Sequence, residues 1–309
     1  MIKHFLAGTP VILLIVFGYI LRQFKFLKLS TVDDIKKLVL NITLPALLFT
    51  SFLGMKIDIS HLAVPVIVVI FCIITLFAGK FLGPLVKMRN PYFPFLISSY
   101  GIGVFSYAIF MALYGEHNLH LIAFLDIGMT TFVFTIYIAM LEVVVYGKST
   151  GKNRFVSVIT SPMILAVILG GLLGSFNIIP TDNSLFVIVK KVISMLGSTT
   201  VPIISLSIGY SISIDKKSLA LSSATVFWRK LLAVALMLIV NELIIPTFLP
   251  FAMAYRHALM ILALTPPSIL VSIMVPIEDV ENSNYVNTTI SIDSIVSLFL
   301  MILTAAVYW

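Results

Sequence analysis

Long apolar runs separated by short polar segments follow one another along all 309 residues of the chain. Each run comes close to the roughly 20 apolar residues that a helix needs to cross a bilayer. We therefore expect an all-α integral membrane protein with ten transmembrane helices. The runs lie near residues 5–22, 34–54, 63–86, 93–115, 119–146, 155–177, 190–212, 229–249, 252–276 and 283–308.

The composition supports a membrane protein and argues against an enzyme. The chain is 60% hydrophobic and 11% charged, whereas soluble domains are roughly 45–50% apolar and about 25% charged. Ten spans use about 200 residues, which leaves no room for a soluble catalytic domain, so we expect neither catalytic residues nor a cofactor. The single Cys72 excludes a disulfide framework. Glu116, His117 and His120 lack a strict ligand pattern, so we predict no metal site.

The net charge of +7 comes from basic residues in short turns beside the apolar runs. If the N-terminus faces out, the inner connections carry most of the 20 Lys and Arg, with Arg229 and Lys230 among them. The positive-inside rule then places both termini outside a multi-pass cell-membrane protein. The same distribution argues against a nucleic-acid partner and leaves membrane lipids as the surroundings.

The two halves of the sequence share an internal similarity. A shift of 157 residues aligns Leu44-Pro45 with Val201-Pro202, and residues 57–62 with residues 214–219. Duplication of a five-helix unit predicts inverted repeats, a common plan of secondary transporters, with repeats at 1–147 and 148–309. A chance resemblance between membrane helices is the alternative.

The fourth and ninth runs contain residues that interrupt helices. Two glycines lie within residues 98–106, and Pro266-Pro267 lies within residues 264–272. Interrupted helices in corresponding positions of two repeats favour a substrate site, where helix N-termini attract an anion such as a carboxylate. A simple proline kink and glycine-mediated helix packing are the alternative. The candidate binding residues are Tyr100, Gly101, Gly103, Ser106, Thr265, Pro266, Pro267 and Ser268, with Asn41 as a further residue that either lines the site or bridges helices.

Two carboxylates lie deep inside apolar runs. Asp126 is in the fifth run and Asp293 is in the tenth. Charged residues at such depth are costly and are candidates for function, here for coupling to protons or another cation. The alternative is a structural carboxylate that is hydrogen-bonded to neighbouring hydroxyl groups.

Several segments resemble the auxin efflux carrier family. That family includes plant auxin exporters and bacterial malate or malonate permeases, and it belongs to a superfamily with bile-acid, arsenite and riboflavin transporters. The segments are residues 17–22, 38–49, 126–134, 161–166 and 196–203.

The resemblance implies a scaffold of helices within 5–54 and 155–212, and a transport unit within 63–146 and 229–308. The fourth and ninth helices would cross in the transport unit. It also implies a coupling role for Lys37 and Asp58, which are otherwise interfacial charges near the ends of the second run. The chain departs from the family pattern at Gly101, Ala108 and Asp293.

The function that these features predict is secondary transport of a small organic anion, such as malate or malonate, by an elevator-type movement coupled to protons. A homodimer could form through the scaffold. A sodium-coupled carrier of the bile-acid symporter type is the first alternative. An intramembrane aspartyl protease is disfavoured because Asp126 lacks a preceding Tyr and Asp293 lacks a preceding Gly-x-Gly. A membrane sensor is a further alternative.

Overall fold

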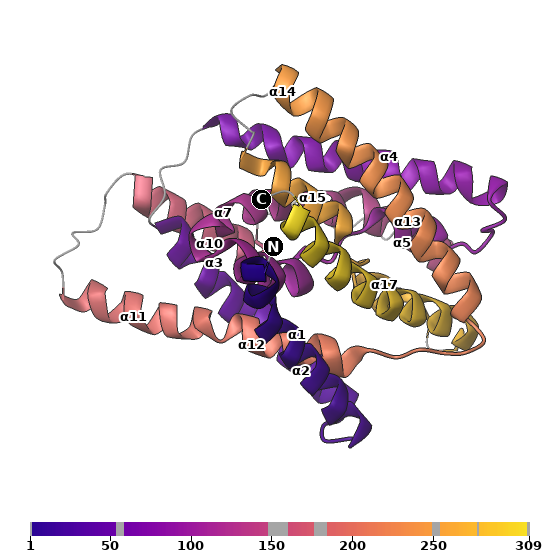
Figure 1. Cartoon of the computed structure of the whole chain (residues 1–309), viewed down its shortest axis with the longest axis horizontal. Helices are drawn as coiled ribbons and strands as arrows, with labels where there is room; N and C mark the ends of the chain where they lie inside the picture. Colours follow the sequence, from indigo (N-terminus) through magenta and orange to yellow (C-terminus); the bar gives the residue numbers. More distant parts are fainter. Residues whose placement is uncertain are drawn as a thin grey trace.

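The computed structural model describes residues 2–53, 59–147, 160–175, 184–248, 254–276 and 278–307, and these residues form helices with no strand among them (Figure 1). The predicted all-α class is confirmed. In chain order the helices are α1 (Ile2–Gln23), α2 (Leu29–Leu38), α3 (Leu44–Leu53), α4 (Ala63–Leu85), α5 (Phe93–Ser98), α6 (Tyr107–Tyr114), α7 (Leu119–Phe132), α8 (Ile138–Tyr146), α10 (Pro162–Ser175), α11 (Ser184–Ser198), α12 (Thr200–Ser211), α13 (Leu219–Ile239), α14 (Ile245–Phe248), α15 (Arg256–Leu264), α16 (Leu270–Met274) and α17 (Val280–Val307).

Short π-helical segments continue several of these helices. The segments η1 (Val39–Thr43), η5 (Val133–Tyr137) and η6 (Val240–Ile244) join neighbouring helices without a gap, and η3 (Ile102–Ser106) leads directly into α6. The 3₁₀ turns η2 (Ile59–Leu62) and η4 (Glu116–Asn118) precede α4 and α7. Because π-helical turns often mark functional positions, η3 is notable for its place in the fourth predicted span.

Among the described residues, 6 helical stretches are long and apolar enough to cross a bilayer. The protein is therefore a multi-pass membrane protein. Two shorter apolar helices are Thr9–Gln23 and Pro162–Gly174. The long stretches are Leu29–Leu53, Ala63–Leu85, Glu116–Tyr146, Phe186–Ser211, Leu219–Thr247 and Val280–Thr304.

Helices α1 and α12 pack unusually closely through two glycines. A Cβ atom on Gly18 would lie 2.1 Å from the carbonyl oxygen of Leu206, and a Cβ atom on Gly209 would lie 1.8 Å from that of Ile15. Only glycine allows the two backbones to approach this far, as in other membrane helix pairs.

Helices α10 and α3 form a second glycine contact of the same kind. A Cβ atom on Gly170 would lie 2.6 Å from the carbonyl oxygen of Phe49, and one on Gly174 would lie 2.3 Å from that of Leu53. The first helix of each sequence half thus packs on the second helix of the other half.

The fourth and ninth predicted spans are both interrupted. The chain leaves α5 after Ser98 and is extended until helical structure resumes at Ile102. It leaves α15 after Leu264 and becomes helical again at Leu270, because Pro266 and Pro267 have no N–H group to continue the hydrogen bonding. We call residues 99–101 the first break and residues 265–269 the second break.

The prediction of an eighth helix that begins at residue 229 is wrong. Helix α13 begins at Leu219, ten residues earlier, and Arg229 and Lys230 lie buried in its middle. The hydroxyl residues of its first turns lower the apolar character of the sequence there. Ser222 and Thr225 are nevertheless buried, and they donate hydrogen bonds to the carbonyl oxygens of Tyr285 and Leu221. The two basic residues are therefore not charges of an inner connection.

We predict that Gly209→Ala lowers the melting temperature of the purified protein in detergent by roughly 5 °C, because the added methyl group overpacks the contact between α1 and α12. Ile20→Ala, on an exposed face of α1, is the control and should have a much smaller effect. Equal melting temperatures for Gly209→Ala and the unmodified protein would contradict the close packing of these helices.

Candidate functional site

The two breaks meet and are joined by hydrogen bonds. The N–H of Gly101 donates to the carbonyl oxygen of Pro266 at 2.8 Å, and the N–H of Ser268 donates to Oγ of Ser99 at 3.2 Å. A Cβ atom at Gly101 would lie 3.3 Å from the carbonyl oxygen of Pro267, which is tighter than ordinary contact. Each break therefore satisfies polar groups that the other exposes, and we call this contact the break junction.

A pair of buried hydroxyl groups also connects the two interrupted helices. Oγ of Ser106 and Oγ1 of Thr265 lie 2.5 Å apart, and both residues are fully buried. Oγ1 of Thr265 donates to the carbonyl oxygen of Ile261. These two predicted binding residues thus contact each other and do not line the neighbouring cavity.

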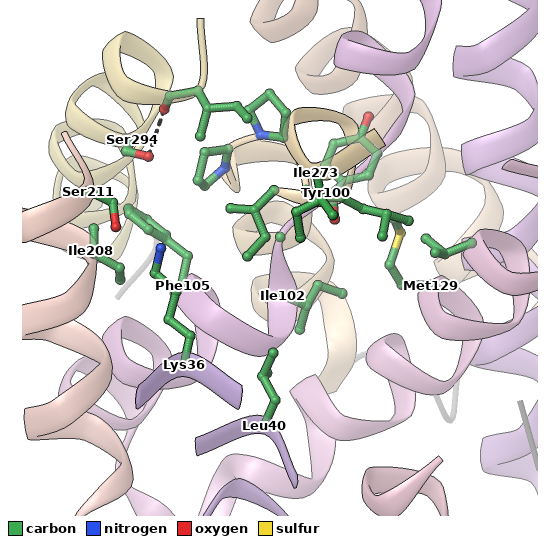
Figure 2. A pocket seen from close by; sticks show the side chains of 18 of the residues that line it. Lys36, Leu40, Tyr100, Ile102, Phe105, Met129, Ile208, Ser211, Ile273 and Ser294 are labelled. Carbon is green, nitrogen blue, oxygen red and sulfur yellow. Dashed lines mark hydrogen bonds between the residues drawn. The ribbon is translucent and has the colours of Figure 1, made fainter. Parts of the chain in front are cut away.

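A cavity of about 290 Å³ lies beside the break junction (Figure 2). Its wall is mostly apolar and combines α2, α7, α12 and α17 with both breaks. Its lining residues are Lys36, Leu40, Tyr100, Gly101, Ile102, Phe105, Asp126, Met129, Thr130, Val133, Phe134, Met163, Ile208, Ser211, Ile212, Pro266, Pro267, Ser268, Ile269, Leu270, Ile273, Ile290, Ser291 and Ser294.

Two charged side chains of opposite sign belong to the cavity wall. Lys36 is 8% exposed, and Figure 2 shows its side chain rising from α2 toward Phe105 and Ser211. Its Nζ lies 3.3 Å from Oδ1 of the exposed Asp33. Asp126 is 7% exposed, and its Oδ2 accepts a hydrogen bond of 3.1 Å from the hydroxyl of Tyr107. An anion in this cavity would therefore meet an ammonium group and a carboxyl group.

A buried ion cluster lies next to the break junction. Nε of Arg229 is 2.8 Å from Oδ2 of Asp293, and Nζ of Lys230 is 2.7 Å from Oδ1 of the same carboxylate. Arg229 and Asp293 are fully buried, and Lys230 is 8% exposed. Two cations against one carboxylate leave this cluster with a net positive charge. We call these three residues the ion cluster.

The guanidinium of Arg229 joins the two interrupted helices. Nη1 donates to the carbonyl oxygen of Leu96 at 2.6 Å, and Nη2 donates to that of Thr265 at 2.8 Å. The guanidinium carbon also lies 4.4 Å from the ring centre of Tyr100, in cation–π contact. One side chain of α13 thus donates to a carbonyl group before the first break and to the first carbonyl group of the second break.

The structure brings many of the predicted site residues to one place. Tyr100, Gly101, Pro266, Pro267, Ser268 and Asp126 line the cavity. Gly103 lies in η3, which continues the fourth span after the first break. Asp293 does not line the cavity. It pairs with the cations of the ion cluster, whereas Asp126 accepts from Tyr107, so the two carboxyl groups do not share a partner.

Other predicted residues lie elsewhere. Asn41 is exposed, and its Nδ2 donates to the carbonyl oxygen of Lys37 at 2.7 Å. Lys37 is exposed and pairs with Asp34 at 3.0 Å. Neither residue is part of the cavity wall. Asp58 lies outside the described residues. Its counterpart under the 157-residue shift is Asp215. The carboxylate of Asp215 accepts hydrogen bonds from the N–H and the hydroxyl of Ser218, and these bonds lower the pKa of that carboxyl group.

Sequence reasoning missed Lys36, Arg229 and Lys230 as site residues. For Lys36 a signal was present, because the spacing of Val32, Lys36 and Val39 puts the lysine on the buried face of its helix. For Arg229 and Lys230 the only sign was an apolar sequence on both sides, Val226–Trp228 before and Leu231–Val234 after. No group of three or more potential metal ligands occurs in the part of the chain that the structure describes.

The comparisons with known proteins point to membrane transport. Residues 5–148 match a family model described as membrane transport protein. The chain is similar to an uncharacterized transporter of Methanothermobacter thermautotrophicus, with 23% identity over 307 residues that cover 93% of both chains. It is also similar to an uncharacterized transporter of Methanocaldococcus jannaschii, with 24% identity over 216 residues, 66% of this chain and 67% of the relative.

The helical membrane fold and these similarities define a membrane transporter and not an enzyme. The match of residues 5–148 to the membrane transport protein model agrees with the resemblance to the auxin efflux carrier family that the sequence motifs indicate.

We predict that Arg229→Met lowers the melting temperature in detergent by roughly 10 °C, since it leaves carbonyl groups at both breaks and one side of Asp293 without their partner. The exposed Arg89 provides the matched control, and Arg89→Met should melt close to the unmodified protein. Similar melting temperatures for the two variants would contradict the role of Arg229 in joining the breaks.

Proposed function

We propose that the chain is a secondary active transporter of a small organic anion, coupled to protons, which binds its substrate in the cavity beside the break junction. The observation that carries this proposal is the composition of one cavity wall. Both interrupted helices, a buried ammonium group and a buried carboxyl group contribute to it. Secondary transporters bind substrates where interrupted helices meet.

The pattern of helix packing supports two inverted repeats at 1–147 and 148–309. Helix α1 packs on α12 while α10 packs on α3, and α4 packs on α7 while α13 packs on α17. Oγ1 of Thr200 donates to Oγ1 of Thr43 at 3.0 Å, and these residues are 157 positions apart, the same shift that aligns the two halves of the sequence. Contact between equivalent residues is expected where two related units meet at a two-fold axis. On this basis we propose ten membrane-spanning segments.

The packing also supports a scaffold and a transport unit. Helices α1, α3, α10, α11 and α12 contact one another, whereas α4, α5, α7, α13, α15 and α17 form a second set of contacts. In Figure 1, α11 and α12 lie at the lower left, whereas α4 crosses the upper part and α13 runs from the top down to the right. The cavity has walls from both sets. Movement of the second set against the first would carry the substrate in the manner of an elevator.

The electrostatics favour an anion as substrate. Lys36 reaches the cavity wall, the ion cluster beside the junction has excess positive charge, and Ser211, Ser291 and Ser294 add hydroxyl groups. Binding pockets for small molecules measure roughly 300–1,000 Å³, so a cavity of about 290 Å³ suits a small carboxylate better than a bulky one. Malate and malonate are of the right size and charge.

Asp126 is the residue that we propose for proton coupling. Its carboxyl group belongs to the cavity wall and has Tyr107 as a hydrogen-bond donor. A carboxyl group inside the membrane that can reach a cavity is a candidate for proton exchange with either side.

The proposal also includes the orientation and the oligomeric state of the protein. Both termini would lie outside the cell, and the turn residues Lys25, Lys28 and Lys216 are on the side expected to face the cytoplasm. A homodimer would form through the scaffold.

The unmodified protein in proteoliposomes should take up radiolabelled malate or malonate faster when a proton gradient is imposed. Lys36→Gln should weaken anion binding roughly 10- to 100-fold, the effect of losing a hydrogen bond to a charged group. Lys37→Gln is the matched control, because Lys37 is exposed and outside the cavity wall. Equal apparent affinities for the two variants would contradict binding of the anion at Lys36.

Asp126→Asn should remove the response to the proton gradient while exchange of labelled for unlabelled anion continues. The amide retains the size of the side chain and an oxygen that can accept from Tyr107, but it cannot carry a proton. Asp34→Asn, which changes an exposed carboxylate, should respond to the gradient as the unmodified protein does. Gradient-driven uptake by Asp126→Asn would exclude this residue as the coupling group.

A further inference from the structure

The ammonium group of Lys230 lies among four oxygen atoms at the second break. The carbonyl oxygen of Leu264 is 2.7 Å away, that of Thr265 is 3.4 Å away, Oδ1 of Asp293 is 2.7 Å away and Oγ of Ser297 is 2.8 Å away. The set consists of two backbone carbonyls, a carboxylate and a hydroxyl group. Neither Lys230 nor any of the four residues that supply these oxygens belongs to the cavity wall.

These oxygens form the kind of set that binds a hard cation. Such cations take carboxylate, carbonyl and hydroxyl oxygens as ligands. In secondary transporters, the carbonyl groups of interrupted helices and the C-terminal ends of half-helices coordinate the coupling ion. The end of α15 supplies both features here, because Leu264 is its last residue and Thr265 begins the second break.

The two carbonyl groups are available because the second break takes away their usual donors. In a continuous helix the carbonyl of Leu264 would accept from the N–H of Ser268, but that N–H donates to Ser99 across the break junction. The carbonyl of Thr265 would accept from the N–H of Ile269, which lies beyond the two prolines. Buried carbonyls without donors are costly inside a membrane, so a cation from elsewhere in the chain stabilises them.

We infer that Lys230, supported by Arg229, is a tethered cation that permanently occupies a coupling-cation site at the break junction, so that this protein needs no sodium ion there. Arg229 extends the same role to the first break through the carbonyl of Leu96. Asp293 balances part of the charge of the two side chains. The consequence, transport without sodium, rests on the proposed function, whereas occupancy of the site by Lys230 does not.

The test is the melting temperature of the purified protein in NaCl and in choline chloride of the same ionic strength. The unmodified protein should melt at the same temperature in both salts. Lys230→Ala removes the ammonium and leaves the four oxygens with a space beside them, so it should melt lower in choline chloride. Titration with NaCl should then raise its melting temperature by roughly 3 °C along a saturable curve.

Two further variants make the sodium response specific. Asp293→Asn in the Lys230→Ala background removes the carboxylate and should abolish the response to NaCl. Lys37→Ala, which removes an exposed ammonium, should melt alike in both salts. A saturable rise of the unmodified protein in NaCl would overturn the inference even if no variant can be purified, and so would identical melting of Lys230→Ala in both salts.

The outcome for the proposed function is separate. If Lys230→Ala gains the sodium response but the unmodified protein carries no organic anion in proteoliposomes, the tethered cation is supported and the anion-transport proposal fails. If sodium stimulates anion uptake by the unmodified protein and also raises its melting temperature along a saturable curve, anion transport is supported and the tethered cation is overturned.

Discussion

The structure depends on one constraint, which is that the backbone of an interrupted membrane helix must find partners inside the protein. Here the two breaks satisfy each other. Gly101 donates to Pro266, Ser268 donates to Ser99, and Ser106 contacts Thr265. The absence of a side chain at Gly101 allows the two extended segments to approach, and the missing N–H groups of the prolines make the approach necessary.

The same constraint accounts for the buried charges. Carbonyl groups before both breaks accept hydrogen bonds from Arg229 or Lys230, and Asp293 pairs with both cations. A buried ion pair contributes little net stability by itself, but loss of one partner is costly. The ion cluster is thus best understood as a device that holds two broken helices in one geometry, while Lys36 and Asp126 remain available at the cavity wall.

The sequence was sufficient to predict the helical class, the two breaks and the depth of Asp126 and Asp293. Each of these rests on a local signal, namely the length of the apolar runs, the Pro-Pro pair and glycines within a run, and a carboxylate isolated in an apolar run. It was not sufficient for the partners of those groups. In the sequence, Arg229 and Lys230 resemble topology signals. Only the structure shows that α13 begins at Leu219 and that the hydrogen bonds of these two side chains reach residues 34 to 133 positions away. Lys36 and Lys37 are adjacent, and only the rotation of α2 decides which one reaches the cavity.

In the proposed elevator-type movement the two interrupted helices move as one body against the scaffold, and disulfide cross-linking tests this movement most directly. Both cysteine pairs are introduced in a background with Cys72→Ala. The first pair, Ser106→Cys with Thr265→Cys, would link the two interrupted helices. The second pair, Ser213→Cys with Ser291→Cys, would link the segment after α12 to α17, where the N–H of Ser213 donates to Oγ of Ser291 at 2.9 Å. Anion flux should persist when the first pair is oxidised, stop when the second pair is oxidised, and return on reduction. Loss of flux with the first pair and full flux with the second would contradict the account.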